Sequence, residues 1–228
     1  MITSGSTQLL IDSGPGILRK MLEVGITYQD PDLLLYTHLH PDHTADLVPI
    51  LFACKYGDFP REKDLLCVGG PGFKFFFEEL EKLYAPWIKP PSYPLTVKEV
   101  HKEPLLYRDI QIFSKPVAHI SGSVGYRIEF KNGKSIAISG DMDYCQNMID
   151  LGIEVDLLVL ECSFPDERKV EGHLTPSLAG RIAFESRCKK LLLTHLYPVC
   201  DQFDIVHQCR QTYEGEIVLG EDLLKIRI

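Results

Sequence analysis

The stretch that decides the fold is a short run rich in histidine, Thr37-His38-Leu39-His40-Pro41-Asp42-His43. It ends an apolar, strand-like run over residues 33–37. Alternate side chains of an extended chain share one face, so His38, His40 and Asp42 point into the same cleft. His43 joins them where residues 42–48 predict a helix start, with Pro49 in its first turns. His38 and His40 can therefore hold one metal ion while Asp42 and His43 hold a second.

Two ions need more ligands than these residues supply, and three further candidates end other strand-like runs. His119 closes the run at 111–118, Asp141 follows 135–140, and His195 follows 190–194. An α/β sheet concentrates its chemistry at the carboxyl ends of its strands. Five histidines and two aspartates form a nitrogen and oxygen ligand set, which suits Zn²⁺ or Mn²⁺ better than a thiolate cage would. We expect His101 and His207 to be ordinary core or surface groups.

The order and spacing of these residues resemble the metallo-β-lactamase superfamily, and most of all its ribonuclease Z branch. The resemblance covers nearly the whole chain and also rests on residues 9–16, 139–141, 161–164, 172–175 and 193–195. It implies two divalent ions, one held by His38, His40 and His119, the other by Asp42, His43 and His195, with Asp141 bridging both.

The resemblance also gives roles to three residues outside the ligand set. It implies that Glu161 and His173 correspond to the glutamate and histidine that the branch uses near the leaving group. Asp12 would orient the metal-binding loop. Simpler interpretations stay open: Glu161 could end a buried strand, His173 could precede a helix capped by Thr175, and Asp12 could be a turn residue.

We expect one α/β domain over residues 1–228, built as a four-layer αββα sandwich of two sheets with outer helices. Asn132-Gly133 predicts a hairpin between strands at 126–130 and 135–138. A Phe-rich helix at 72–84 should pack on a sheet, with a subunit interface or pocket wall as the alternative. The remaining predicted elements are strands at 8–12, 156–160 and 190–194, and helices at 16–24 and 176–187.

Two features depart from the ribonuclease Z pattern. The chain opens at Met1, so we expect about 20 residues of the usual first hairpin to be absent, which would leave a sheet edge that favours association. A homodimer is expected by resemblance. Between His43 and His119 there is no long, basic, Gly-rich arm for clamping tRNA, and residues 55–64 are short and of mixed charge.

Composition predicts a cytoplasmic enzyme. No apolar run approaches the roughly 20 residues that span a bilayer, no signal peptide is evident, and seven scattered cysteines without a C-x-x-C pair indicate reduced thiols. The net charge of −8 provides no global attraction for nucleic acid, so metals and a local basic patch would have to meet a polyanion.

Together with the ligand set, the resemblance implies a metal-dependent hydrolase that cleaves phosphodiester bonds with a hydroxide activated by two metals. Asp42 would orient or deprotonate the nucleophile, and His173, held by Glu161, would protonate the leaving alkoxide. The first candidate substrate is RNA, such as a tRNA 3′ end, and the second is a cyclic nucleotide or other small phosphodiester. A non-phosphoester metallohydrolase and an inactive metal-binding module are further alternatives. The absence of a cysteine ligand, and of a helical domain after His195, disfavours hydrolases of the β-lactam or glyoxalase II kind.

Overall fold

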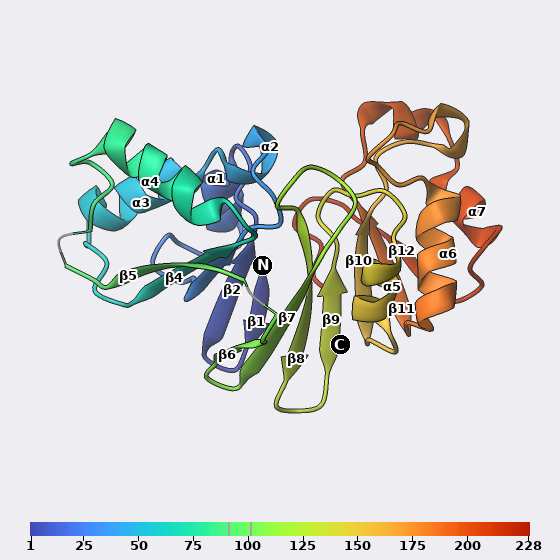
Figure 1. Cartoon of the computed structure of the whole chain (residues 1–228), viewed down its shortest axis with the longest axis horizontal. Coiled ribbons are helices and arrows are strands. Elements are labelled where there is room, and N and C mark those ends of the chain that lie inside the picture. Colours follow the sequence, from blue (N-terminus) through green and yellow to red (C-terminus); the bar gives the residue numbers. More distant parts are fainter. Residues whose placement is uncertain (91, 101) are drawn as a thin grey trace. The chain divides into compact units, whose positions relative to one another are not determined.

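The computed structural model describes residues 1–90, 92–100 and 102–228, and His101 lies outside them. The chain divides into two compact units, Met1–Val100 and His101–Ile228, each with its own sheet and helices (Figure 1). Both sheets mix parallel and antiparallel pairs, which agrees with the predicted α/β class. Among the described residues, no helix is long and apolar enough to span a bilayer.

The first unit contains a five-stranded sheet in the order β1-β2-β3-β4-β5. Its strands are β1 (Ile2–Ser4), β2 (Thr7–Ile11), β3 (Leu33–Leu35), β4 (Leu65–Gly69) and β5 (Leu95–Glu99). β1 and β2 form a short antiparallel hairpin, and the other pairs are parallel. Three helices, α1 (Ile17–Glu23), α3 (Leu47–Tyr56) and α4 (Phe73–Tyr84), cover one face (Figure 1).

The segment after the histidine motif forms two helices where the sequence predicts one start. α2 (Pro41–Thr44) ends before α3 begins, and Asp46 separates them as the N-cap of α3. The backbone N–H of Asp46 donates to the Ser13 carbonyl at 2.8 Å, so it does not extend the helical ladder of α2. Pro49 lies in the first turn of α3, as expected.

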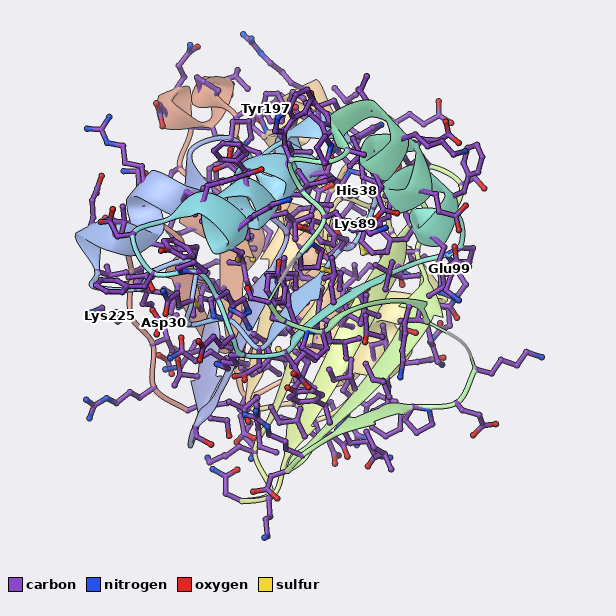
Figure 2. The ribbon with its side chains drawn as sticks, turned by 90° about the vertical axis from the view of Figure 1, so that its left-hand side faces the viewer. Asp30, His38, Lys89, Glu99, Tyr197 and Lys225 are labelled. Atoms are coloured by element: carbon purple, nitrogen blue, oxygen red, sulfur yellow. The ribbon has the colours of Figure 1, made fainter. Side chains whose placement is uncertain are left out.

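The Phe-rich helix packs on its sheet as predicted. Phe73 and Phe77, four residues apart, are buried on one face of α4, whereas Phe75 is 67% exposed. The start of the helix is anchored by Glu99 at the end of β5, labelled in Figure 2. Its Oε1 accepts the backbone N–H groups of Gly72 and Lys74 at 2.9 and 3.0 Å. A carboxylate there satisfies N–H groups that have no partner within the helix.

The second unit contains a seven-stranded sheet in the order β12-β11-β10-β9-β8-β7-β6. The strands are β6 (Leu105–Tyr107), β7 (Ile110–Pro116), β8 (Val124–Phe130), β9 (Ser135–Ile138), β10 (Leu157–Glu161), β11 (Lys190–Thr194) and β12 (Glu216–Leu219). The predicted hairpin of β8 and β9 is confirmed, and Gly133 takes a φ of 79° in its turn.

Helices α5 (Gln146–Gly152), α6 (Pro176–Ser186) and α7 (Ile205–Arg210) pack with this sheet around one apolar core (Figure 1). Two short 3₁₀ helices, η1 (Asp166–Arg168) and η2 (Pro198–Gln202), follow β10 and β11. β9 to β12 are parallel, and β7 runs in the same direction because two antiparallel pairings separate it from β9. The carboxyl ends of β7, β9, β10 and β11 therefore share one edge of the sheet.

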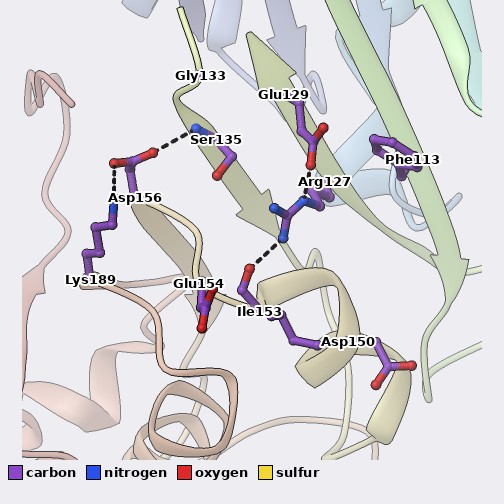
Figure 3. Close-up of a pocket in the computed structure, with 10 residues that line it drawn as sticks. All are labelled: Phe113, Arg127, Glu129, Gly133, Ser135, Asp150, Ile153, Glu154, Asp156 and Lys189. Carbon is purple, nitrogen blue, oxygen red and sulfur yellow. Dashed lines mark hydrogen bonds and ion pairs between the residues drawn. The ribbon is translucent and has the colours of Figure 1, made fainter.

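The opposite edge, where β9, β10 and β11 begin, is held by Asp156 (Figure 3). Its Oδ2 accepts the backbone N–H of Ser135 at 2.9 Å, and its Oδ1 accepts from Lys189 and Lys134 at 3.0 and 3.1 Å. A pocket of about 450 Å³ opens here, and none of the predicted site residues is among the described residues that line it. Burial raises the pKa of Asp156, but these hydrogen bonds outweigh it and lower the pKa from 3.8 to about 2.

This ion-pair network predicts a pH-dependent contribution to stability. A carboxyl whose pKa is lowered on folding stabilises the protein above pH 4, and that contribution is lost as the pH falls towards 2. We expect Asp156→Asn to lower the free energy of unfolding by about 1–2 kcal/mol at pH 6, with a smaller difference at pH 2.5. Urea unfolding of the wild type and the variant at both pH values measures this, with exposed Asp58→Asn as the control. An equal difference at both values would contradict it.

Candidate metal and catalytic site

The histidine motif brings four predicted ligands together within the first unit. His38 and His40 converge, with Nε2 of the former 3.1 Å from Nδ1 of the latter. The ring centroids of His38 and His43 lie 4.0 Å apart, and His43 Nε2 lies 3.7 Å from Asp42 Oδ2. His38 and His43 are buried, whereas the side chain of Asp42 is 50% exposed. Nitrogen donors 3.1 Å apart can share an ion when metal–nitrogen bonds are about 2.0–2.1 Å long.

Asp12 orients this loop from the end of β2. Its Oδ2 accepts from His43 Nδ1 and from the Thr37 hydroxyl, both at 2.7 Å, and its Oδ1 accepts the Thr37 backbone N–H at 2.8 Å. Donation from Nδ1 leaves Nε2 as the nitrogen of His43 that can face a metal. The same contacts explain why β3 ends at Leu35, two residues before the predicted end, because the N–H of Thr37 bonds to a carboxylate and not to a strand.

The loop after Asp12 supports the backbone of the motif. The Ser13 N–H donates to the His43 carbonyl at 2.7 Å. A Cβ at position 14 would overlap the carbonyl oxygen of Asp42, so this close approach requires Gly14. Asp12 itself has a φ of 54°, a left-handed conformation that costs free energy in a residue with a side chain. This strained turn places the Asp12 carboxylate within hydrogen-bond distance of His43.

In the second unit, the shared strand edge collects the other predicted ligands. His119 follows β7, Asp141 follows β9 and His195 follows β11. Asp141 is 3% exposed, and its Oδ1 lies 3.5 Å from His195 Nε2. His119 Nδ1 donates to the Gly172 carbonyl at 2.9 Å, so its Nε2 is the nitrogen that can face a metal.

Glu161 and His173 form a second pair at this edge. Glu161, at the end of β10, is 1% exposed and its Oε1 accepts from His173 Nδ1 at 3.0 Å. This hydrogen bond raises the pKa of His173 above its ordinary value, although burial alone would lower it. The negative charges of Glu161 and Asp141 also raise this pKa. The ring of His173 lies 5.2 Å from that of His119 and 6.4 Å from that of His195. Its Nε2 can therefore carry a proton close to the predicted ligands.

Ser163 joins this pair to His195, a contact that the sequence analysis does not predict. Its hydroxyl donates to Glu161 Oε2 at 2.8 Å and therefore accepts from His195 Nδ1, 3.0 Å away. The Ser163 and Met142 backbone N–H groups also donate to the Glu161 carboxylate, both at 3.0 Å. The one available signal is the two-residue spacing of Glu161 and Ser163, which places both side chains on one face of an extended chain.

Asp143 holds the loop that carries His173, and the sequence analysis also misses this residue. Its Oδ2 accepts from Lys169 Nζ at 2.7 Å and from the Gly172 N–H at 3.0 Å. Burial raises the pKa of Asp143, but hydrogen bonds led by that from Lys169 lower it below its ordinary value. The fixed loop positions the Gly172 carbonyl for His119. In contrast, His207 is exposed on α7 beside Gln211, which agrees with its expected role as an ordinary surface group.

The residues of both units suit a divalent metal. The donors are imidazole nitrogens and carboxylate oxygens, and no cysteine is among the predicted ligands. His43, His119 and His195 each bond through Nδ1 to a carboxylate, a carbonyl or a hydroxyl. Partners of this kind orient metal-binding histidines and set their tautomer.

Comparison with known proteins identifies the family to which the chain belongs. A model of the β-lactamase superfamily domain matches residues 7–196. An uncharacterized protein of Mycobacterium tuberculosis H37Rv is 28% identical over 229 residues, which cover 96% of this chain and 81% of that protein. A ribonuclease Z of Mycolicibacterium gilvum is 27% identical over 256 residues, which cover 100% of this chain and 88% of the relative.

The crystal structure of the metallo-β-lactamase fold protein YhfI from Bacillus subtilis superimposes with a TM-score of 0.80 at 25% identity. The superposition covers 96% of this chain and 86% of that one. The superfamily match extends across both units and over most of the sequence. The chain therefore belongs to the metallo-β-lactamase superfamily and is a metal-dependent hydrolase, as its motifs predict.

Proposed function

We propose that the two units form one domain whose ligand groups join in a dinuclear metal centre. One ion would be held by His38, His40 and His119, the other by Asp42, His43 and His195, with Asp141 between them. The superfamily match, which includes all seven residues, supports this assignment. So do the contacts that orient His43, His119 and His195 through Nδ1. Zn²⁺ is the first candidate for both ions and Mn²⁺ the second.

The reaction that we propose is phosphodiester hydrolysis. Divalent ions at these ligands would lower the pKa of a water molecule and neutralise charge on the phosphoryl oxygens. Asp42 would orient that water or take its proton, because its carboxylate is half exposed beside His43. His173 would donate a proton from Nε2 to the leaving alkoxide. The observation that carries this role is the hydrogen bond from His173 Nδ1 to buried Glu161, which holds the ring and favours its protonated form.

The first candidate substrate is RNA, on the ground that a ribonuclease Z is 27% identical over the full chain. The second candidate is a cyclic nucleotide or another small phosphodiester. It is favoured by the net charge of −8 and by the short connection of residues 57–64 between α3 and β4, where no clamp for tRNA is present among the described residues. The cytoplasmic location and the homodimer stay predictions from sequence.

The chemical step is tested with two leaving groups. Zn²⁺-loaded protein should hydrolyse bis(p-nitrophenyl) phosphate, and Asp42→Ala should lower kcat at least 100-fold. His173→Ala should lower turnover of a diester with an alkoxide leaving group about 100-fold, but that of the nitrophenyl diester only a few-fold, because nitrophenolate leaves without a proton. Asp58→Ala and His207→Ala, both at exposed positions, are the matched controls. Equal losses on both substrates would remove His173 from the acid role.

The substrate class is tested by comparing kcat/KM for RNA with kcat/KM for cyclic nucleotides. We expect Zn²⁺-loaded protein to cleave a precursor tRNA at its 3′ end. The kcat/KM values for this tRNA, for 3′,5′-cyclic AMP and for 2′,3′-cyclic AMP are measured in the same buffer. A kcat/KM for the cyclic nucleotides at least tenfold above that for tRNA would establish the second candidate and reject the first.

The orienting role of Ser163 predicts an effect on metal affinity. Ser163→Ala removes the acceptor for His195 Nδ1, and loss of such a partner typically weakens metal binding about 10–100-fold. Competition with a chromophoric chelator measures the affinity for Zn²⁺ without any substrate. Ser186→Ala is the control, since Ser186 is also buried but its hydroxyl bonds to the Ala183 carbonyl within α6. Unchanged affinity in Ser163→Ala would show that this contact does not orient a ligand.

A further inference from the structure

Two aromatic rings stand beside His173 in the second unit. Phe164, three residues after Glu161, and Tyr197, two residues after His195, stack with centroids 4.8 Å apart and an interplanar angle of 23°. Phe164 is partly buried and lies edge-on to His173 at 5.6 Å. Tyr197 lies edge-on to His173 at 6.3 Å and to His195 at 5.7 Å. Both rings follow directly on segments that carry predicted site residues.

Two contacts hold Tyr197 in place. Phe164 stacks on one face of the Tyr197 ring, and the backbone N–H of Tyr197 donates to the Ser163 carbonyl at 3.3 Å. In spite of these contacts Tyr197 remains 40% exposed. An aromatic ring that is backed by a second ring and partly exposed loses little entropy when another planar group stacks on it.

The Tyr197 ring lies on the side where the leaving group of the substrate would bind. A proton donor must lie within hydrogen-bond distance of the leaving oxygen, so the leaving group would lie beside His173. Tyr197 is the exposed ring of the stack beside that histidine. A leaving group that carries a planar ring would meet Tyr197 once its oxygen reaches His173.

We propose that Tyr197, backed by Phe164, is a stacking subsite for a nucleobase on the leaving side of the scissile phosphodiester. The inference rests on the proposed function, because it takes the leaving side from the role of His173. The ligand class is a nucleoside attached through phosphate, and the subsite is indifferent to which base is bound because every base has an aromatic face. Tyr197 is a specificity residue, not part of the proton transfer.

The test compares two nucleotides that differ only in the planarity of the base. Uridine 5′-monophosphate has a flat aromatic ring, whereas 5,6-dihydrouridine 5′-monophosphate has a puckered, saturated one with the same hydrogen-bonding edge. We expect Zn²⁺-loaded wild-type protein to bind the first about tenfold more tightly than the second in isothermal titration calorimetry. This comparison needs no variant and therefore does not depend on the folding of one.

The variants then assign the effect to the ring. Tyr197→Leu should bring the ratio of the two dissociation constants close to one, while Tyr197→Phe should keep it within about twofold of the wild type. Tyr144→Leu is the control for loss of a tyrosine, since Tyr144 bonds to Glu185 elsewhere in this unit. Equal binding of the two nucleotides, no binding of either at millimolar concentration, or an unchanged ratio in Tyr197→Leu would overturn the proposal.

The subsite and the proposed hydrolysis can fail separately. Turnover of bis(p-nitrophenyl) phosphate together with equal binding of the two nucleotides would reject the subsite and keep the phosphodiesterase. A tenfold preference that depends on Tyr197, with no turnover of any diester, would keep Tyr197 as a stacking site for a nucleobase but reject the reaction, and with it the assignment to the leaving side.

Discussion

Parallel strand pairing is the constraint on which the candidate site depends. Parallel neighbours send their carboxyl ends to the same edge, so residues that follow separate strands meet without being close in sequence. In the first unit, β2 and β3 bring Asp12 next to Thr37. In the second, the parallel strands β9, β10 and β11 deliver Asp141, Glu161 and His195 to one edge, and the two antiparallel pairings of β8 bring the end of β7, and with it His119, to the same edge.

Buried carboxylates fix the geometry of the side chains gathered at these edges. A buried charge is costly unless hydrogen bonds surround it, and the donors that surround it lose their freedom in return. Glu161 holds His173 and Ser163, and Ser163 holds His195. Asp12, which is only partly buried, also accepts hydrogen bonds from His43 and Thr37. At the opposite edge of the second sheet, Asp156 accepts hydrogen bonds from Lys134 and Lys189. No predicted ligand is among the described contacts of Asp156. A buried carboxylate thus serves stability at one edge and orientation at the other.

The net charge of the chain and the aromatic rings beside His173 favour some substrates over others. A metal-dependent hydrolase with a net charge of −8 and no clamping arm in its described residues has little long-range attraction for a large polyanion. Recognition would then depend on short-range contacts beside the phosphate. The stacked pair of Phe164 and Tyr197 offers such a contact, because stacking is independent of net charge and of salt.

The sequence by itself determined the superfamily of this protein, its class as a metal-dependent hydrolase and most of its elements. The alternation of His38, His40 and Asp42, the ligands placed after apolar runs, and Asn132-Gly133 between alternating strands are local patterns, and local patterns follow from backbone periodicity. It did not show where β3 ends, why α2 and α3 are separate, or what Ser163, Asp143 and Tyr197 contact. Those features depend on partners distant along the chain, such as Asp12 for Thr37, Ser13 for Asp46 and His195 for Ser163. Only the tertiary structure decides such pairings, because the free energy of a hydrogen bond depends on the distance between its atoms and not on their separation in sequence.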